Sequence, residues 1–186
     1  MRPELQAEVD RLFRLCERFE VPITRRQWAS DDDIAEVEQK TGIRLSDDLR
    51  DLYRFSDGGN YLETWFAAFT RELNAYWFCP LTEACRVHGW TTAPMLSEAA
   101  NNGGVPRDAR IQPLDRHTRW FPFADYANGN AILYFDADPA PRGTCGQIIS
   151  WHYDPEAVRF CAADLIAFFH TSNNLLELHG ARLLRW

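Results

Sequence analysis

Hydrophobic residues recur at helical spacing near the start of the chain. Between Leu5 and Phe19 one set of apolar positions recurs every three or four residues, and charged residues such as Glu8, Arg11 and Arg14 lie elsewhere on the helix. This pattern predicts an amphipathic helix of about four turns, because a helix repeats every 3.6 residues. Pro22 sets its latest end, since the residue before a proline disfavours helical geometry. The apolar members are Leu5, Val9, Leu12, Cys16 and Phe19.

Two more helices are predicted from their end signals. Ser30 precedes the three aspartates of 31–33. A serine caps a helix start, and carboxylates in the first turn complement the helix dipole. Gly42 occupies the position where a glycine ends such a helix. Ser46 opens a third helix in the same way, and the glycine pair 58–59 is expected to stop it.

The middle of the chain is ambiguous. Residues 61–69 fit a helix or a strand, whereas 76–79 are typical of a short buried strand. Thr82 begins another helical pattern that continues through Met95. The turn-forming residues 101–104 are expected to end it.

After residue 110 the period changes to that of strands. Short apolar and aromatic runs occur at 120–123, 131–135 and 147–151, separated by turn clusters at 125–130 and 138–143. Connections this short favour antiparallel neighbours over parallel crossovers. A last helix follows, with its inward positions at Leu165, Phe168, Phe169, Leu175 and Leu176.

Helices first, a strand meander next and a closing helix predict an α+β fold. We expect a mixed, largely antiparallel sheet flanked by N-terminal helices and a C-terminal helix. The length suits a single domain over residues 1–186. Within it, residues 1–29 are expected to form an N-terminal helical extension.

Composition and charge narrow the classes of function. Acidic residues number 27 and basic residues 20, which gives a net charge of −7. Nucleic-acid binding and anionic membrane surfaces are both disfavoured, because they require clustered Lys and Arg. A basic protein partner would be attracted.

The five cysteines are scattered and form no C-x-x-C pair, so zinc-ribbon and redox motifs are not predicted. Their apolar neighbours favour buried free thiols in a reducing compartment. The N-terminus lacks the apolar stretch of a signal peptide, and no apolar run has the length of a spanning helix. The expected location is therefore the cytoplasm. The thiols are Cys16, Cys79, Cys85, Cys145 and Cys161.

Several segments, taken in order, resemble one protein family. The run 43–53 with Asp57-Gly58-Gly59, then Trp120-Phe121-Pro122-Phe123-Ala124, Asn128-Gly129-Asn130, Phe135-Asp136-Ala137-Asp138-Pro139, Gly146-Gln147-Ile148-Ile149 and 161–169 resemble the SUKH superfamily, in its Smi/Knr-type branch. The likeness covers roughly Ser30 to Leu178. Ser46, where a proline is usual, and the longer 60–80 segment depart from the pattern. In this comparison 161–169 correspond to the family's closing helix.

The resemblance implies a mixed sheet flanked by helices, without known catalysis. Bacterial members commonly act as immunity proteins that bind and silence a cognate toxin, and fungal relatives regulate cell-wall assembly. The expected function is therefore a non-catalytic immunity protein that needs no cofactor and binds a toxin domain. The alternative is an intracellular regulator or scaffold for an endogenous protein partner, and an enzyme is the third hypothesis.

The sequence signals for catalytic and metal-binding groups are weak. Asp136 and Asp138 form a D-x-D that could hold a divalent cation, but the following proline is typical of a turn. Cys145 and His152 invite a thiol nucleophile and its base, yet along one extended strand they would lie roughly 20 Å apart. The histidines show no metal-binding spacing. No catalytic, cofactor or metal residue is predicted.

Two structural roles are also predicted. Trp120 is expected to be buried at the start of a strand, and the step from Asn128 to Gly129 to form a turn with positive φ. Turns and sheet edges supply the expected contact surface for the partner. Its predicted members are Asp57, Glu63, Asp125, Asn130, Asp136 and Asp138.

Overall fold

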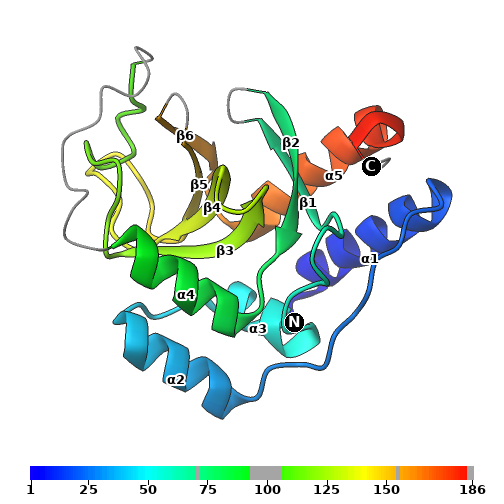
Figure 1. The fold of residues 1–186 in the computed structure, drawn as a ribbon, viewed down its shortest axis with the longest axis horizontal. Helices are drawn as coiled ribbons and strands as arrows, with labels where there is room; N and C mark the ends of the chain where they lie inside the picture. Colours follow the sequence, from blue (N-terminus) through cyan, green and yellow to red (C-terminus); the bar gives the residue numbers. More distant parts are fainter. Residues whose placement is uncertain (70–71, 93–105, 154–155, 184–186) are drawn as a thin grey trace.

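The computed structural model describes residues 1–69, 72–92, 106–153 and 156–183, and its architecture is α+β (Figure 1). The predicted fold class is confirmed. In chain order the elements are α1 Pro3–Arg18, α2 Asp31–Thr41, α3 Asp47–Phe55, β1 Phe66–Phe69, β2 Leu73–Phe78, α4 Leu81–Thr91, β3 Trp120–Tyr126, β4 Ala131–Asp136, β5 Gln147–His152, β6 Ala157–Ala162 and α5 Leu165–Leu183.

The six described strands form one curled sheet in the order β1-β2-β3-β4-β5-β6. Each strand pairs with its neighbours in sequence, and each of these pairings is antiparallel. The sheet is thus a meander, as the short turn clusters predict. The register places Trp77 of β2 opposite Asp125 of β3.

Local sequence explains both ends of α2 and the start of α3, whereas α3 ends at Phe55, before the glycine pair 58–59 that was expected to stop it. The Ser30 hydroxyl accepts the backbone N–H of Asp33, and the Asp33 carboxylate accepts the N–H of Ser30 in return. This reciprocal arrangement satisfies donors that a helix start leaves free. Gly42 ends α2 with φ 68°, a left-handed conformation that glycine adopts without strain. The Ser46 hydroxyl accepts the N–H of Leu49 at the start of α3. These predicted caps are confirmed.

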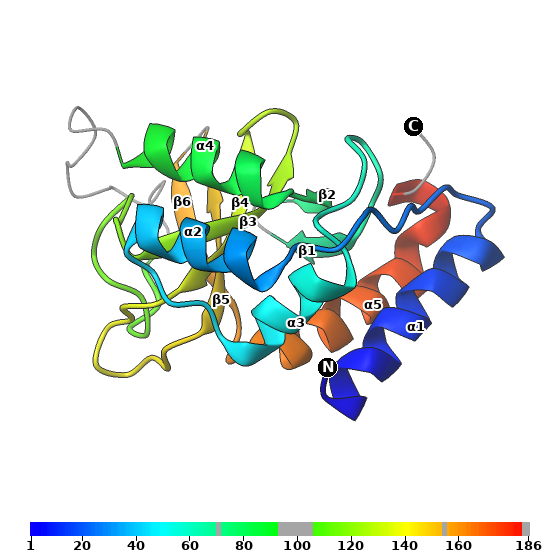
Figure 2. The ribbon, with the colours of Figure 1, turned by 90° about the horizontal axis from the view of Figure 1, so that it is seen from below.

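Helix α1 lies alongside α5, so the two ends of the chain share one layer (Figure 2). The apolar side of α1 is fully buried at Leu5, Val9 and Leu12. Polar contacts flank it, since Arg11 donates to Glu177 and Asn173 donates to the Glu8 backbone oxygen. We propose that residues 1–29 are an extension that folds as part of the same domain.

The buried side chains gather on both faces of the sheet. The larger cluster joins the sheet to α1, α3 and α5 and includes Phe66, Phe78, Phe123 and Phe168. A second cluster lies on the opposite face and includes Trp120, Ile132, Tyr134, Ile149 and Trp151. Trp120 is 1% exposed, so its predicted burial is confirmed.

One element differs from what the family resemblance implies. Residues 157–162 form the edge strand β6, whereas Cys161 and Ala162 were expected to belong to the closing helix. These residues pair with β5 in antiparallel register, with Val158 opposite Trp151 and Phe160 opposite Ile149. The helix itself begins only at Leu165. The apolar run 161–169 therefore spans two elements.

The ambiguous middle segments are also settled. The segment 61–69 contains the strand Phe66–Phe69, and 76–78 end β2, with Cys79 just after it. The helix expected from Thr82 is α4, which ends at Thr91. Met95 and the predicted stop at 101–104 lie outside the described residues.

The cysteines are free, and two of them, Cys16 and Cys79, are buried as predicted. Cys145 is exposed, which corrects the expectation for that residue. It lies in the connection between β4 and β5, where small and turn-forming neighbours provide no cover. Cys85 and Cys161 are partly buried.

Candidate functional site

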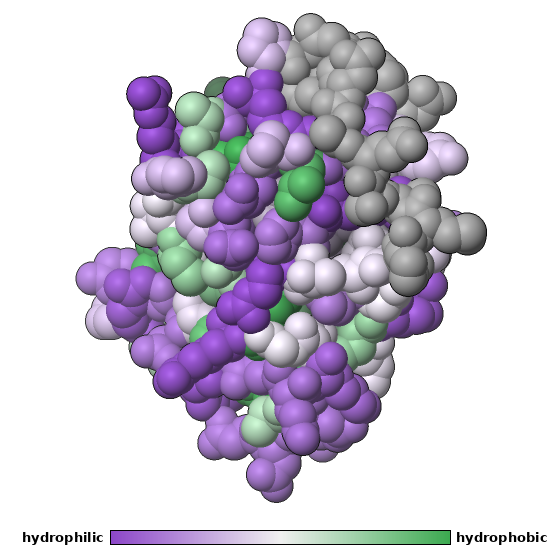
Figure 3. Space-filling model, turned by 90° about the vertical axis from the view of Figure 1, so that its left-hand side faces the viewer, coloured by the Kyte–Doolittle hydropathy of each residue, from purple (hydrophilic) through white to green (hydrophobic). Residues whose placement is uncertain are grey.

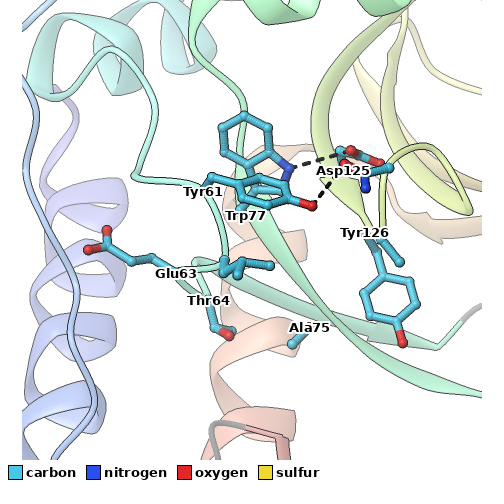
Figure 4. Close-up of a pocket in the computed structure, with 10 residues that line it drawn as sticks. Tyr61, Glu63, Thr64, Ala75, Trp77, Asp125 and Tyr126 are labelled. Atoms are coloured by element: carbon cyan, nitrogen blue, oxygen red, sulfur yellow. Dashed lines mark hydrogen bonds between the residues drawn. The ribbon is translucent and has the colours of Figure 1, made fainter. Parts of the chain in front are cut away.

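A cavity of about 280 Å³ opens where three parts of the chain meet (Figure 4). The loop before β1 forms one wall, β2 forms the floor, and the β3–β4 turn forms the opposite wall. We call it the aromatic pocket. Its lining residues are Tyr61, Leu62, Glu63, Thr64, Ala75, Trp77, Asp125, Tyr126, Ala127 and Asn128.

The loop wall is fixed by two glycines that follow α3. Gly58 has φ 76°, and a side chain there would lie 2.5 Å from the backbone nitrogen of Pro80. A side chain at Gly59 would meet the indole nitrogen of Trp65 at 2.1 Å. The Gly59 N–H also donates to the Phe78 oxygen at 2.8 Å. Only glycine permits both the positive φ and these close approaches, so the pair predicted as a helix stop also anchors the pocket loop to β2.

Glu63 holds the same loop from outside the pocket. Its carboxylate accepts the backbone N–H and the hydroxyl of Thr24 and, on the loop, the backbone and side-chain N–H groups of Asn60. Figure 4 shows this side chain pointing away from the other pocket residues. Glu63 therefore acts as an internal clamp between the N-terminal segment and the pocket loop.

The opposite wall is the tight turn between β3 and β4. Ala127, Asn128 and Gly129 have φ of 50°, 58° and 89°, so the predicted positive-φ turn is confirmed. The Asp125 carboxylate accepts the Gly129 N–H at 2.7 Å and stabilises this left-handed run. Tyr61 donates its hydroxyl hydrogen to Asn128 Oδ1 at 2.8 Å and so joins the two walls.

Aromatic rings form the apolar part of the pocket. Tyr61 and Trp77 contact each other edge to face, with ring centroids 5.4 Å apart. The Trp77 indole N–H points at Asp125 Oδ2, with the heavy atoms 3.5 Å apart. Asp125 is 3% exposed, and burial raises the pKa of its carboxyl group. The pocket thus combines aromatic walls with one buried acidic group.

Besides Glu63, two predicted contact residues are internal. Asp136 is fully buried, where it accepts the Gln147 side-chain N–H and the Asp138 backbone N–H. The expectation of a surface role is therefore corrected for Asp136, because its carboxylate orders the turn after β4. Burial raises the pKa of this group. Asp125 is also buried beside the turn that it stabilises, and it lines the aromatic pocket.

The other predicted contact residues have separate environments. Asp57 accepts the N–H of Leu81 at 2.8 Å and so caps α4 from outside the helix. Burial raises the pKa of Asp57. Asn130 is exposed next to the pocket turn. Asp138 is half-exposed on another part of the surface, with His117 Nε2 at 3.2 Å. The structure brings Glu63, Asp125 and Asn130 into one region and keeps Asp57, Asp136 and Asp138 apart from it.

The described residues contain no cluster of three or more metal-ligating side chains. The D-x-D pattern forms the turn that its proline suggested, with Asp136 Oδ1 accepting the Asp138 N–H at 3.0 Å. Within the described part of the chain, none of the helices is both long and apolar enough for a bilayer.

Sequence reasoning missed the aromatic members of the pocket. Tyr61 is 49% exposed and Leu62 is 62% exposed, and the latter adopts φ 72°. A leucine in that conformation is unusual. The available signal is the segment 60–80, which is longer than the family pattern and rich in aromatic residues. Its aromatic residues do form one wall and the floor of the pocket.

Comparison with protein families matches residues 29–171 to the SMI1 / KNR4 family (SUKH-1). The match covers more than half of the chain and includes every strand of the sheet. A search of curated proteins finds no match.

Proposed function

Because the chain belongs to the SMI1 / KNR4 family (SUKH-1), we propose that it is an immunity protein that binds a toxin domain and neutralises it. The family supports a protein-binding role, in immunity or in regulation, for this chain in general. The choice of immunity is our proposal. It follows the resemblance to bacterial members, in which that role is common.

The exposed apolar side chains at the aromatic pocket support a contact surface there. Tyr61 and Leu62 project from the loop wall beside the partly buried Trp77. Interface hot spots are enriched in such aromatic groups next to well-packed pockets. Figure 3 views the molecule from the left-hand side of Figure 1; there the coloured residues are largely hydrophilic, with small separate hydrophobic patches. The pocket is therefore our candidate for the centre of the interface.

Charge supports the choice of partner. The chain carries a net charge of −7, so a basic toxin domain, such as a nuclease, would be steered toward it. Asn130 and Asp138 are exposed and remain proposed contacts. Glu63 and Asp57 would act indirectly, by positioning the pocket loop and α4. Association is expected to slow as salt rises, because exposed charges are screened beyond about 8 Å at physiological ionic strength.

The proposed mechanism is occlusion without catalysis. A rigid scaffold that buries about 800 Å² on each side is sufficient for stable binding. The buried carboxylates hold turns and helix ends, which are structural tasks. The free thiols are compatible with action in the cytoplasm, which we propose as the location.

The test is growth rescue in a bacterial host that expresses a toxin domain encoded beside this gene. Co-expression of the chain is expected to restore growth, and the purified proteins should form a one-to-one complex. Leu62→Asp should abolish rescue, because it puts a charge into the apolar rim. Leu178→Asp is the matched control, since Leu178 is 76% exposed on α5.

Rescue by the wild-type chain and by Leu178→Asp, but not by Leu62→Asp, would support both the role and the surface. No rescue and no binding with any neighbouring toxin domain would contradict the immunity role. A regulator of an endogenous partner would then be favoured.

A further inference from the structure

The aromatic pocket contains a buried carboxylate that lacks a positive partner. Within the described part of the chain, no ion pair is formed by Asp125, although it is 3% exposed. Arg86 interacts electrostatically with Asp125 at a distance, but its guanidinium donates to both carboxylate oxygens of Glu83. Burying a charge without a counter-charge costs free energy.

The two oxygens of Asp125 differ in their hydrogen bonding. Oδ1 accepts the Gly129 N–H at 2.7 Å, which is a well-formed bond. Oδ2 has the Trp77 indole N–H at 3.5 Å, at the long limit for such a bond. The Tyr126 backbone N–H is a third donor to this carboxylate. An ionised carboxylate has about four acceptor positions, so the group keeps capacity for one further donor on the pocket side. The carboxylate of Glu63 points away from the pocket and accepts donors from Thr24 and Asn60, so it does not compete for the same ligand.

The walls suit a side chain with an apolar stem and a cationic head. Trp77 and Tyr61 offer aromatic faces and edges near the carboxylate, and Ala75 leaves the floor open. A guanidinium or ammonium group gains energy over an aromatic face. A charge-assisted hydrogen bond to a carboxylate is stronger than a neutral one.

We propose that the aromatic pocket binds an arginine or lysine side chain of the partner protein, with Asp125 as its counter-charge. The inference rests on the proposed function only in assuming that the partner is a protein. The net charge of −7 favours such a basic residue at long range. At short range, the pocket turns that general attraction into recognition of one side chain.

Binding of a long cationic side chain also gives a role to the hydrogen bond that connects the two walls of the pocket. The Tyr61 hydroxyl bond to Asn128 keeps the loop and the turn at a fixed separation. Preorganised walls lower the entropic cost of ordering a long, flexible side chain on binding. The pocket is thus shaped before its ligand arrives.

The test uses a short neutral-ended peptide, acetyl-Gly-Arg-Gly-amide, and its citrulline analogue, which has nearly the same shape without charge. Each is titrated into the full chain while the Trp77 indole N–H resonance is followed by NMR. We expect saturable shifts with the arginine peptide and at least about tenfold weaker binding of the citrulline peptide. A lysine peptide should bind in the same place.

Two variants keep the result interpretable. Asp125→Asn retains an acceptor for Gly129 and should weaken arginine binding about tenfold. Ala75→Leu fills the floor without a change in charge and should block the peptide. Equal binding of the arginine and citrulline peptides, no binding of either, or normal binding by both folded variants would overturn the proposal.

The two proposals fail separately. If the chain binds the arginine peptide more tightly than the citrulline peptide but neutralises no toxin, the cation pocket is supported and the immunity role is contradicted. If a toxin is neutralised while the two peptides bind equally well or not at all, the immunity role is supported and the cation pocket is contradicted.

Discussion

The hydroxyl of Tyr61 donates to Asn128 Oδ1 at 2.8 Å across a sequence separation of 67 residues. This bond connects a loop that precedes the sheet to a turn in its middle. Neither partner is buried, so the bond holds the walls of the pocket in place rather than stabilising the core.

Tyr61→Phe should loosen the pocket with little effect on global stability. The ring keeps its edge-to-face contact with Trp77, so we expect the unfolding free energy to fall by less than about 1 kcal/mol. Amide hydrogen exchange at Ala127 and Gly129 should become severalfold faster, because the turn loses its tie. Tyr153→Phe changes only an exposed hydroxyl and keeps the backbone bond from Tyr153 N–H to the Asn130 oxygen, so it should leave that exchange unaltered. Unchanged exchange in Tyr61→Phe would contradict the role of the bond.

Glu63→Gln should destabilise the whole domain. The carboxylate accepts four hydrogen bonds. Glutamine replaces one of the two oxygens with an NH2 group, which is a donor and cannot accept the hydrogen bonds made at that position. We expect a loss of about 1–3 kcal/mol in urea denaturation. Glu36→Gln is the control, because its pair with Lys40 is exposed and such pairs add little to stability. Equal losses in both variants would contradict the clamp.

Trp120→Ala should remove a buried ring and leave a cavity on the α4 side of the sheet. The expected cost is ~3–5 kcal/mol, measured as a shift in the urea midpoint with an unchanged slope. Trp28→Ala is the control for loss of a tryptophan at an exposed position, since Trp28 is 61% exposed. That variant should stay within about 0.5 kcal/mol of the wild type. A near-normal midpoint for Trp120→Ala would refute the assignment to the core.

Asp136→Asn should change how stability depends on pH. Burial raises the pKa of Asp136, so the folded chain keeps this proton to a higher pH than the unfolded chain. The unfolding free energy therefore falls as pH rises from the unfolded value near 4 through the raised folded pKa. The asparagine variant lacks that contribution, so its stability relative to wild type should increase over the same interval.

Urea denaturation at several values between about pH 4 and pH 7 measures this difference. Asp138→Asn is the control for changing one carboxylate to an amide, because its side chain is half-exposed and its backbone N–H bond to Asp136 is kept. A constant offset between Asp136→Asn and wild type across the interval would contradict the prediction.

The helices were predictable because their signals are local. Ser30 and Gly42 mark the ends of α2 with side chains that act within a few residues. The central strands were predictable because each apolar run lies between strong turn formers. Strand β6 was missed because its last residues, Cys161 and Ala162, continue into the apolar run of α5, and a period of two is then hard to separate from a helical one.

The pocket could be predicted only in part. The positive-φ turn at Asn128 and Gly129 follows from sequence, since few residue pairs suit it. The partnership of that turn with Tyr61 and Trp77 depends on how the sheet brings distant segments together. The burial of Asp125 and Asp136 has the same origin, because a carboxylate that follows a strand is exposed or enclosed according to its tertiary surroundings.

The Glu63 clamp reaches beyond the part of the chain that the family match covers. Its partner Thr24 precedes residue 29, where that match begins. A chimera that transplanted only the matched region into a relative would leave two acceptor sites of the carboxylate empty and the pocket loop free to drift. Successful grafting of the binding specificity therefore requires the donor's segment 20–29 along with the residues that line the pocket.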